Sequence, residues 1–153
     1  MRLRATSFLA LLIMSFSGFS PCVGQVPENF LANNVVLLIR HSEKPLSGNG
    51  LSPQGEVRAS LYADYFRPFR DTVAPMHIDS LFAGADSKNS MRPRLTLEPL
   101  SKAANLPIDS SIGSNEPAAL VAELRSHAHG LHPLIAWRHG ELPALLEAFG
   151  ASP

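Results

Sequence analysis

Two short apolar runs, at residues 35–39 and 133–137, are each followed by the same kind of polar segment. The first run leads into Arg-His-Ser-Glu at positions 40–43, and the second leads into Arg-His-Gly-Glu at positions 138–141. A short unbroken apolar run is typical of a strand that is buried on both faces, as in a parallel sheet. The carboxyl ends of such strands meet at the edge where α/β proteins bind ligands. We therefore expect both Arg-His pairs at one ligand-binding edge.

A helix is predicted soon after the first run. Ser52 followed by Pro53 is a typical helix start, because a hydroxyl caps the free N–H groups and proline fits the first turn. Val57, Leu61 and Tyr65 recur every four residues, which predicts that they form the buried face of this helix.

The rest of the chain continues the alternation of strand and helix. Further strands are expected at 80–83, around 108 and at 133–137, and further helices at 91–104, 116–127 and 142–149. Pro99 is expected to break or kink the second helix. The order β-α-β-α-β-α-β-α predicts α/β class: a single three-layer α/β/α domain with a mostly parallel sheet.

The N-terminal segment has the pattern of an export signal. Two arginines precede an apolar run at 8–19, which is shorter than the roughly 20 residues that span a bilayer, and small residues follow at 22–24. We predict a signal peptide over 1–24 and a mature domain over 25–153, exported to the periplasm or secreted, with no membrane partner after cleavage. The chain stops at Pro153, shortly after the last expected helix, which indicates a compact domain or a C-terminally truncated one.

The composition excludes several classes of protein. Thirteen Lys and Arg balance thirteen Asp and Glu, so no strongly basic surface indicates a nucleic-acid partner. The one cysteine excludes an internal disulfide framework and any multi-cysteine zinc site. His127, His129 and His132 suggest a metal site, but no acidic or cysteine residue is close to them in the sequence. We therefore expect no metal there.

Arginine and histidine together are suited to handling phosphate. Arginine binds phosphate oxygens with paired donors and keeps its charge. A neutral imidazole is a nucleophile toward phosphorus, and neighbouring guanidinium groups disfavour its protonation. Covalent catalysis through one histidine divides phosphate hydrolysis into two easier steps. A second, protonated histidine can donate to a phosphoryl oxygen as negative charge develops.

Four segments of the chain resemble motifs of the histidine phosphatase superfamily, the phosphoglycerate-mutase-like family. They occur in the family's order between residues 35 and 150. The segment at 40–44 resembles the R-H-G/A-E signature, and the segment at 51–59 is similar to L-(S/T)-x-x-G-x-x-(R/Q)-A. The segment at 87–100 resembles the R-A-x-x-T-A-x-P-L helix through Arg92, Thr96, Pro99 and Leu100, and the segment at 137–140 resembles the second histidine motif.

The resemblance implies the same fold and a metal-independent hydrolase of phosphomonoesters that needs no cofactor. It implies that His41 is the nucleophile that becomes phosphohistidine. Arg40 and Arg92 would bind the phosphoryl oxygens, and His139 would complete that pocket and stabilise the transition state. The partner would be a small phosphorylated substrate or a phosphoprotein. The alternative is a non-catalytic module that binds phosphate or another anion on the same fold.

The proton donor to the leaving oxygen has three candidates. Glu141 follows His139 by two residues and is expected to point toward the crevice from the first turn of the last helix, although a carboxylate is also favourable at a helix N-terminus for electrostatic reasons. Asp86, in the loop before Arg92, is the rival acid. Glu43 is the third candidate, with pairing to an arginine as its expected structural role.

Overall fold

Four parallel strands form the central sheet of this protein, whose computed structural model describes residues 34–70, 75–126 and 132–151. Their order across the sheet is β1-β6-β4-β5, with β1 pairing β6, β6 pairing β4 and β4 pairing β5. The strands are β1 (Leu37–Arg40), β4 (Ser80–Ala83), β5 (Ile108–Asp109) and β6 (Pro133–Trp137). The predicted strands at 80–83 and 133–137 are confirmed to the residue.

The first strand is shorter than predicted. It begins at Leu37, which lies opposite Leu134, and not at Val35, which is 42% exposed. Continuing this register would place Val36 opposite Pro133, and proline has no N–H to donate to a neighbouring strand. The apolar run therefore begins two residues before the first residue that pairs with β6.

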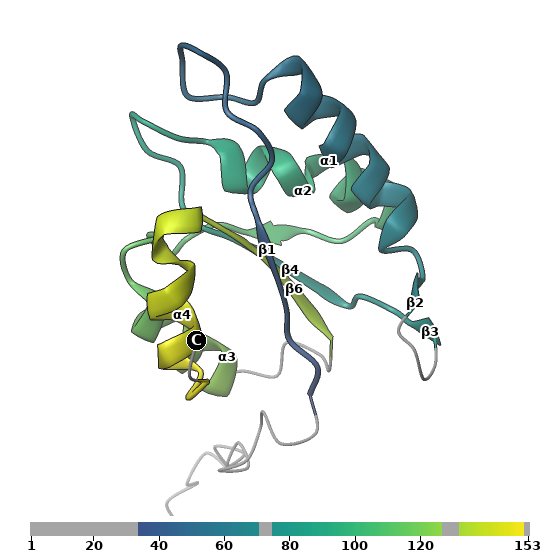
Figure 1. Ribbon diagram of the computed structural model, residues 1–153. Helices are drawn as coiled ribbons and strands as arrows, with labels where there is room; N and C mark the ends of the chain where they lie inside the picture. Colours follow the sequence, from purple (N-terminus) through teal and green to yellow (C-terminus); the bar gives the residue numbers. More distant parts are fainter. Residues whose placement is uncertain (1–33, 71–74, 127–131, 152–153) are drawn as a thin grey trace, which may run out of the picture.

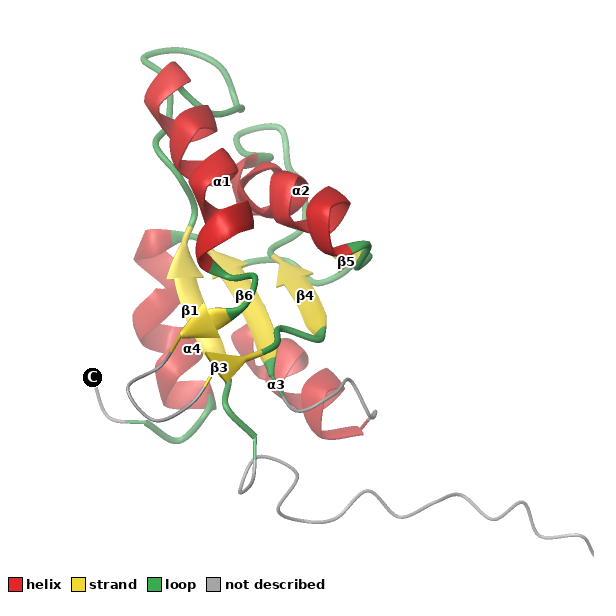
Figure 2. Cartoon of the chain, turned by 90° about the vertical axis from the view of Figure 1, so that its right-hand side faces the viewer, coloured by secondary structure: helices red, strands yellow, loops and turns green. Residues whose placement is uncertain are grey.

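The helices lie in two layers on either side of the sheet (Figure 1). α1 and α2 cover one face, and α3 and α4 cover the other, an arrangement that Figure 2 shows from a second direction. Their bounds are α1 (Pro53–Tyr65), α2 (Arg92–Ala104), α3 (Pro117–Ser126) and α4 (Leu142–Ala148), with a 3-10 turn η2 (His139–Glu141) before α4. The predicted three-layer α/β/α domain is confirmed.

Alternation along the strands divides the core into two halves. Leu81, Ala83 and Leu134 pack with α1 and α2 residues on one face, whereas Phe82 and Ile135 pack with α3 and α4 residues on the other. Successive side chains of a strand point to opposite faces, so a strand that is covered on both faces must be apolar at every position. This arrangement accounts for the unbroken apolar runs.

The N-terminus of α1 is as predicted, but its buried face is not. The Ser52 side chain accepts the Gly55 N–H at 3.1 Å, as an N-cap should. The three residues expected in the core are about 60% exposed; they are Val57, Leu61 and Tyr65. Ala59 and Phe66 are buried in their place.

Close approach explains this reversal. A Cβ atom on Gly55 would lie 2.6 Å from the carbonyl oxygen of Glu43, so only glycine permits this contact. Gly55 and Ala59 are both small and both buried, which allows α1 to lie against the loop after β1 and against α2. The position of α1 is therefore set by its small residues and not by its large apolar ones.

Pro99 does not break α2, so the prediction of a break was wrong. The helix continues from Arg92 to Ala104 with Pro99 inside it. Proline removes one N–H donor, which would bond the carbonyl of Leu95. Leu97 and Leu100, on either side of it, are fully buried in the core between α2 and the sheet. This burial holds both halves of the helix on the sheet.

A second, two-stranded sheet was not predicted. β2 (Phe69–Arg70) and β3 (Pro75–Met76) pair antiparallel, with Phe69 opposite Met76. Each strand has two residues, which is too short for a periodic pattern to indicate. The predicted signal peptide lies outside the described residues. Across the described ranges, no helix has both the length and the apolar character that crossing a bilayer requires.

Candidate active site

The two Arg-His pairs lie side by side at the carboxyl edge of the sheet. β1 and β6 are neighbours, with Arg40 opposite Trp137, so His41 and His139 leave the sheet together. Their ring centroids are 6.1 Å apart and the ring planes cross at 77°. Residues almost 100 positions apart in the chain are thus brought to one place, which is where sequence analysis expected them.

His41 is held by hydrogen bonds at its backbone and its ring. Its N–H donates to the Trp137 carbonyl oxygen at 3.0 Å, which extends the pairing of β1 with β6. Its ring Nδ1 lies 2.7 Å from the Ser42 carbonyl oxygen. A carbonyl oxygen only accepts, so this contact places the proton on Nδ1 and leaves the Nε2 lone pair for chemistry. His41 itself is 7% exposed.

The surroundings of His41 favour its neutral form. The pKa of His41 lies below its ordinary value of 6.5, and burial is the largest cause. The bond to the Ser42 carbonyl acts in the opposite direction, while the positive charges of Arg92 and Arg40 and the neighbouring His139 lower the pKa further. His41 therefore keeps the unprotonated ring that a nucleophile needs.

Thr96 connects the segment of His41 with α2. The Ser42 N–H donates to the Thr96 hydroxyl at 2.9 Å, and that hydroxyl donates to the Arg92 carbonyl oxygen at 2.7 Å. Ser42 and Thr96 are both fully buried. This chain of bonds fixes the start of α2 relative to His41, and it gives Thr96, which sequence analysis left without a role, a positioning function.

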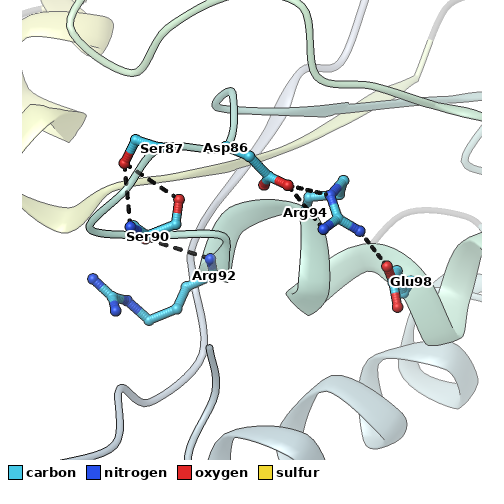
Figure 3. Close-up of polar contacts among 6 residues, drawn as sticks. All are labelled: Asp86, Ser87, Ser90, Arg92, Arg94 and Glu98. Atoms are coloured by element: carbon cyan, nitrogen blue, oxygen red, sulfur yellow. Dashed lines mark hydrogen bonds and ion pairs between the residues drawn. The ribbon is translucent and has the colours of Figure 1, made fainter. Parts of the chain in front are cut away.

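Arg92 has no carboxylate partner in the described part of the chain. Its backbone N–H donates to the Ser90 hydroxyl at 3.4 Å, and its side chain points away from the Asp86–Arg94–Glu98 cluster (Figure 3). Its Nε is buried without a hydrogen-bond partner. Burial, and then the charge of Arg138, lower the pKa of Arg92 from its ordinary value. An oxyanion would satisfy this side chain.

Arg40 is at the outer side of the same edge. Its side chain is 51% exposed, and its Nη2 lies 4.0 Å from the Glu43 carboxylate. That carboxylate is closer to Arg58, at 2.5 Å. Glu43 thus has the structural role that sequence analysis considered for it, and Arg40 is only weakly neutralised.

The structure distinguishes the three candidate acids. Asp86 accepts two bonds from Arg94, at 2.8 and 2.9 Å, on the side of the loop opposite Arg92 (Figure 3). Glu43 is held by Arg58. Glu141 stands at the N-cap of α4, and its carboxylate has no ion pair within the described ranges. Of the three, Glu141 is the carboxylate that no arginine engages.

The histidine-rich segment is only partly described, because residues 127–131 lie outside the described residues. The backbone N–H of His132 donates to both Asp79 carboxylate oxygens at 3.1 Å, and its ring Nδ1 lies 3.8 Å from one of them. An acidic residue that is distant in the sequence is therefore near His132 in space. No group of three potential metal ligands gathers among the residues that the structure describes.

The surface beside the loop that follows His41 is hollowed. A hollow of about 600 Å³ is lined by residues 43–47 and 52–54. It lies between that loop and the start of α1. Lys44 is among the lining residues, and its positive charge attracts anionic molecules.

No protein-family model matches the sequence, and no curated protein matches it. Solved structures do match. The protein histidine phosphatase SixA complexed with tungstate aligns with a TM-score of 0.51 at 16% identity, over 72% of this chain and 73% of that chain. Two further structures are described as phosphohistidine phosphatases SixA. The one from Nakamurella multipartitia has a TM-score of 0.48, 19% identity, and coverage of 77% of this chain and 71% of that chain. The one from Agrobacterium tumefaciens has a TM-score of 0.49, 21% identity, and 74% coverage of both chains.

The alignment with the tungstate complex shows a shared fold. The chain has the same phosphoglycerate-mutase-like fold as that structure, as the four motifs predicted. At 16% identity the comparison establishes the fold and not the chemistry.

Proposed function

We propose that this chain, which shares the fold of a protein histidine phosphatase, hydrolyses phosphomonoesters through a phosphohistidine on His41. One observation carries the proposal. His41 is buried, it lies beside His139, and its pKa is lowered by burial and by the positive charges of Arg92 and Arg40. Nucleophile and oxyanion ligands are therefore together at the edge where α/β folds bind ligands. The substrate would be a small phosphorylated molecule or a phosphoprotein.

The first step transfers the phosphoryl group to the enzyme. The Nε2 lone pair of His41 attacks phosphorus, the P–N bond forms, and the P–O bond to the leaving group breaks. Glu141, in its protonated form, gives its proton to the leaving oxygen. Arg92, Arg40 and His139 donate to the phosphoryl oxygens, which spreads their negative charge over fixed donors.

The second step releases phosphate. Glu141, now ionised, takes a proton from a water molecule that attacks phosphorus, and the P–N bond breaks. The electron pair returns to His41, inorganic phosphate leaves, and Glu141 is again protonated. Neither step is written through a metal ion, because the arginines supply the positive charge that a metal would provide.

The ligand of the matched structure supports an anion site on this fold. The protein whose fold this chain shares was solved with tungstate, and tungstate is a tetrahedral oxyanion of the same shape as phosphate.

Export through residues 1–24 is a further part of the proposal. N-terminal sequencing of protein recovered from the periplasm or the medium tests it, and a start near Gln25 is the expected result.

The test is turnover of an aryl phosphate by the full chain with a metal chelator present. We expect hydrolysis by the wild type, none by His41→Ala, and an acid-labile, alkali-stable phosphoenzyme after rapid quenching. Arg94→Gln is the matched control, since Arg94 is on α2 but is engaged by Asp86 and Glu98. Full turnover by His41→Ala would contradict the proposal. Phosphate binding without turnover by the folded wild type would favour the non-catalytic binding module.

A further inference from the structure

The mechanism above leaves Arg138 without a role. Arg138 directly follows β6, as Arg40 ends β1, and β6 lies between β1 and β4. Ala136 is opposite Ala83, so Arg138 emerges beside the loop that joins β4 to α2. Its Nη2 donates to the Ser87 hydroxyl in that loop at 2.7 Å. Arg138 is therefore attached to the segment that leads into Arg92.

Ser87 is in a tight turn that ends just before Arg92. The Ser87 N–H donates to the Ser90 carbonyl oxygen at 2.9 Å, and the Ser90 N–H donates back at 3.2 Å. The Ser87 hydroxyl accepts from the same Ser90 N–H at 3.2 Å (Figure 3). The Arg92 N–H in turn donates to the Ser90 hydroxyl. This turn fixes Arg138 and Arg92 relative to one another.

Arg92 and Arg138 are neighbours, and no carboxylate of the described residues neutralises their charges. The positive charge of Arg138 lowers the pKa of Arg92, so the two repel. Neither has a carboxylate partner among residues 34–70, 75–126 and 132–151, and the Nε of each is buried without a hydrogen-bond partner. Like charges and unpartnered donors are costly to bury together, and a bound anion compensates both costs.

Arg92 is joined to the segment of His41 through Thr96 and Ser42, whereas Arg138 is joined through Ser87 to the turn before Arg92. The neighbouring side chains that lower the pKa of His41 are Arg92, Arg40 and His139. The charge of Arg138 instead lowers the pKa of Arg92. A phosphoryl group attached to His41 is thus within reach of Arg92. An anionic group on the far side of Arg92 would meet Arg138.

We propose that Arg138, held by Ser87, forms with Arg92 a second anion subsite beside the phosphoryl pocket. It binds a second oxyanion of the substrate, a phosphate or a carboxylate, and so selects doubly anionic substrates over phosphate esters of neutral alcohols. The inference rests on the proposed function, because His41 defines the phosphoryl position. Arg138 is then a specificity residue and not part of the chemical step.

Calorimetric binding to the full chain tests this without turnover. The probes are methylphosphonate, with one anionic group, and phosphonoacetate and methylenediphosphonate, with two. We expect the doubly anionic probes to bind the wild type about 10-fold or more tightly, the effect of one charge-assisted contact. Arg138→Gln should remove this preference and leave methylphosphonate affinity within about 3-fold. Arg94→Gln, the matched control, should keep the preference.

Each other outcome overturns the inference in a recognisable way. Equal weakening of all three probes by Arg138→Gln would make Arg138 a ligand of the phosphoryl group itself. Equal affinity of the wild type for all probes, or no binding of any, would exclude a second subsite. A wild type that shows the preference yet hydrolyses no phosphate ester would retain the subsite and refute the proposed function. The melting temperature of each variant shows whether it folds.

Discussion

Arg92 and Arg94 are two residues apart on α2, yet their surroundings differ. Arg94 is engaged by Asp86 on one side and by Glu98, one helical turn later, on the other. These contacts raise the pKa of Arg94, with the bond to Asp86 as the largest cause. Arg92 has no carboxylate partner in the described part of the chain, a buried unpartnered Nε and a lowered pKa.

Helix geometry accounts for the difference. Two residues advance about 200° around an α-helix, so the two side chains leave α2 on opposite sides (Figure 3). One side faces carboxylates and stabilises the fold. The other faces His41 and has no counter-ion among the described residues. The comparison teaches that an arginine whose charge is already neutralised is structural, while one left without a counter-ion indicates where an anionic ligand belongs.

The largest effect is expected from removing Arg92, for which the described part of the chain provides no counter-ion. Arg92→Gln should lower kcat/KM by about 100- to 1000-fold, because it removes a charge-assisted donor to the transition state. Arg94→Gln should stay within about 3-fold of the wild type, since its partners lie away from His41. Steady-state kinetics with an aryl phosphate measures both. Similar losses in the two variants would break the distinction between them.

A second test concerns the carboxylates. Glu141→Gln should slow an alkyl phosphate, which has a poor leaving group, by about 100-fold or more and an aryl phosphate far less. Asp86→Asn, at the carboxylate that Arg94 already holds, should slow neither substrate by more than about 3-fold. The measurement is kcat for both substrates. A substrate-dependent loss in Asp86→Asn would transfer the acid role to Asp86.

The pH dependence should follow the neighbours of His41. Its lowered pKa keeps the ring neutral at lower pH, so the acid limb of kcat/KM should have its midpoint below 6.5. Arg92→Gln removes a nearby positive charge and should move that midpoint upward, while Arg94→Gln should leave it in place. NMR titration of the His41 ring gives the same quantity directly. A midpoint above 6.5 in the wild type would contradict the assignment.

The same lowered pKa affects stability. The unfolded imidazole binds a proton near pH 6.5 and the folded one only at lower pH, so the unfolded state binds more protons in between. The contribution of His41 to stability is therefore fully present above pH 6.5 and decreases as the pH falls through this window. His41→Ala should lessen the loss of unfolding free energy between neutral and acidic pH.

The smallest effect is expected on stability at Arg94. Its ion pairs are partly exposed, so Arg94→Gln should lower the free energy of unfolding by only about 0.5–1 kcal/mol. Arg92→Gln should lower it less, or raise it, because it removes a charge that no carboxylate of the described residues pairs with. Urea denaturation compares the two. A larger destabilisation by Arg92→Gln would show that Arg92 stabilises the fold by a contact other than an ion pair.

The sequence could predict the sheet and the placement of the histidines because these depend on local order. The expected strands at 80–83 and 133–137 formed to the residue, since burial on both faces leaves consecutive apolar residues, here at 81–83 and 133–137. The position of His41 and His139 just after neighbouring parallel strands then followed from topology. The Ser52 cap is also a local signal, and it was found for that reason.

The pairing of side chains was decided only by the tertiary structure. Whether Asp86 is an acid or a partner of Arg94, and which face of α1 is buried, depends on what the rest of the chain places nearby. Gly55 and Ala59 determine the second question through close packing, which apolar periodicity does not register. That Arg92 and Arg138 have no carboxylate partner among the described residues became visible in the same way. A linear pattern records what each residue is, whereas a counter-ion or a close contact is a property of two segments, and folding alone brings them together.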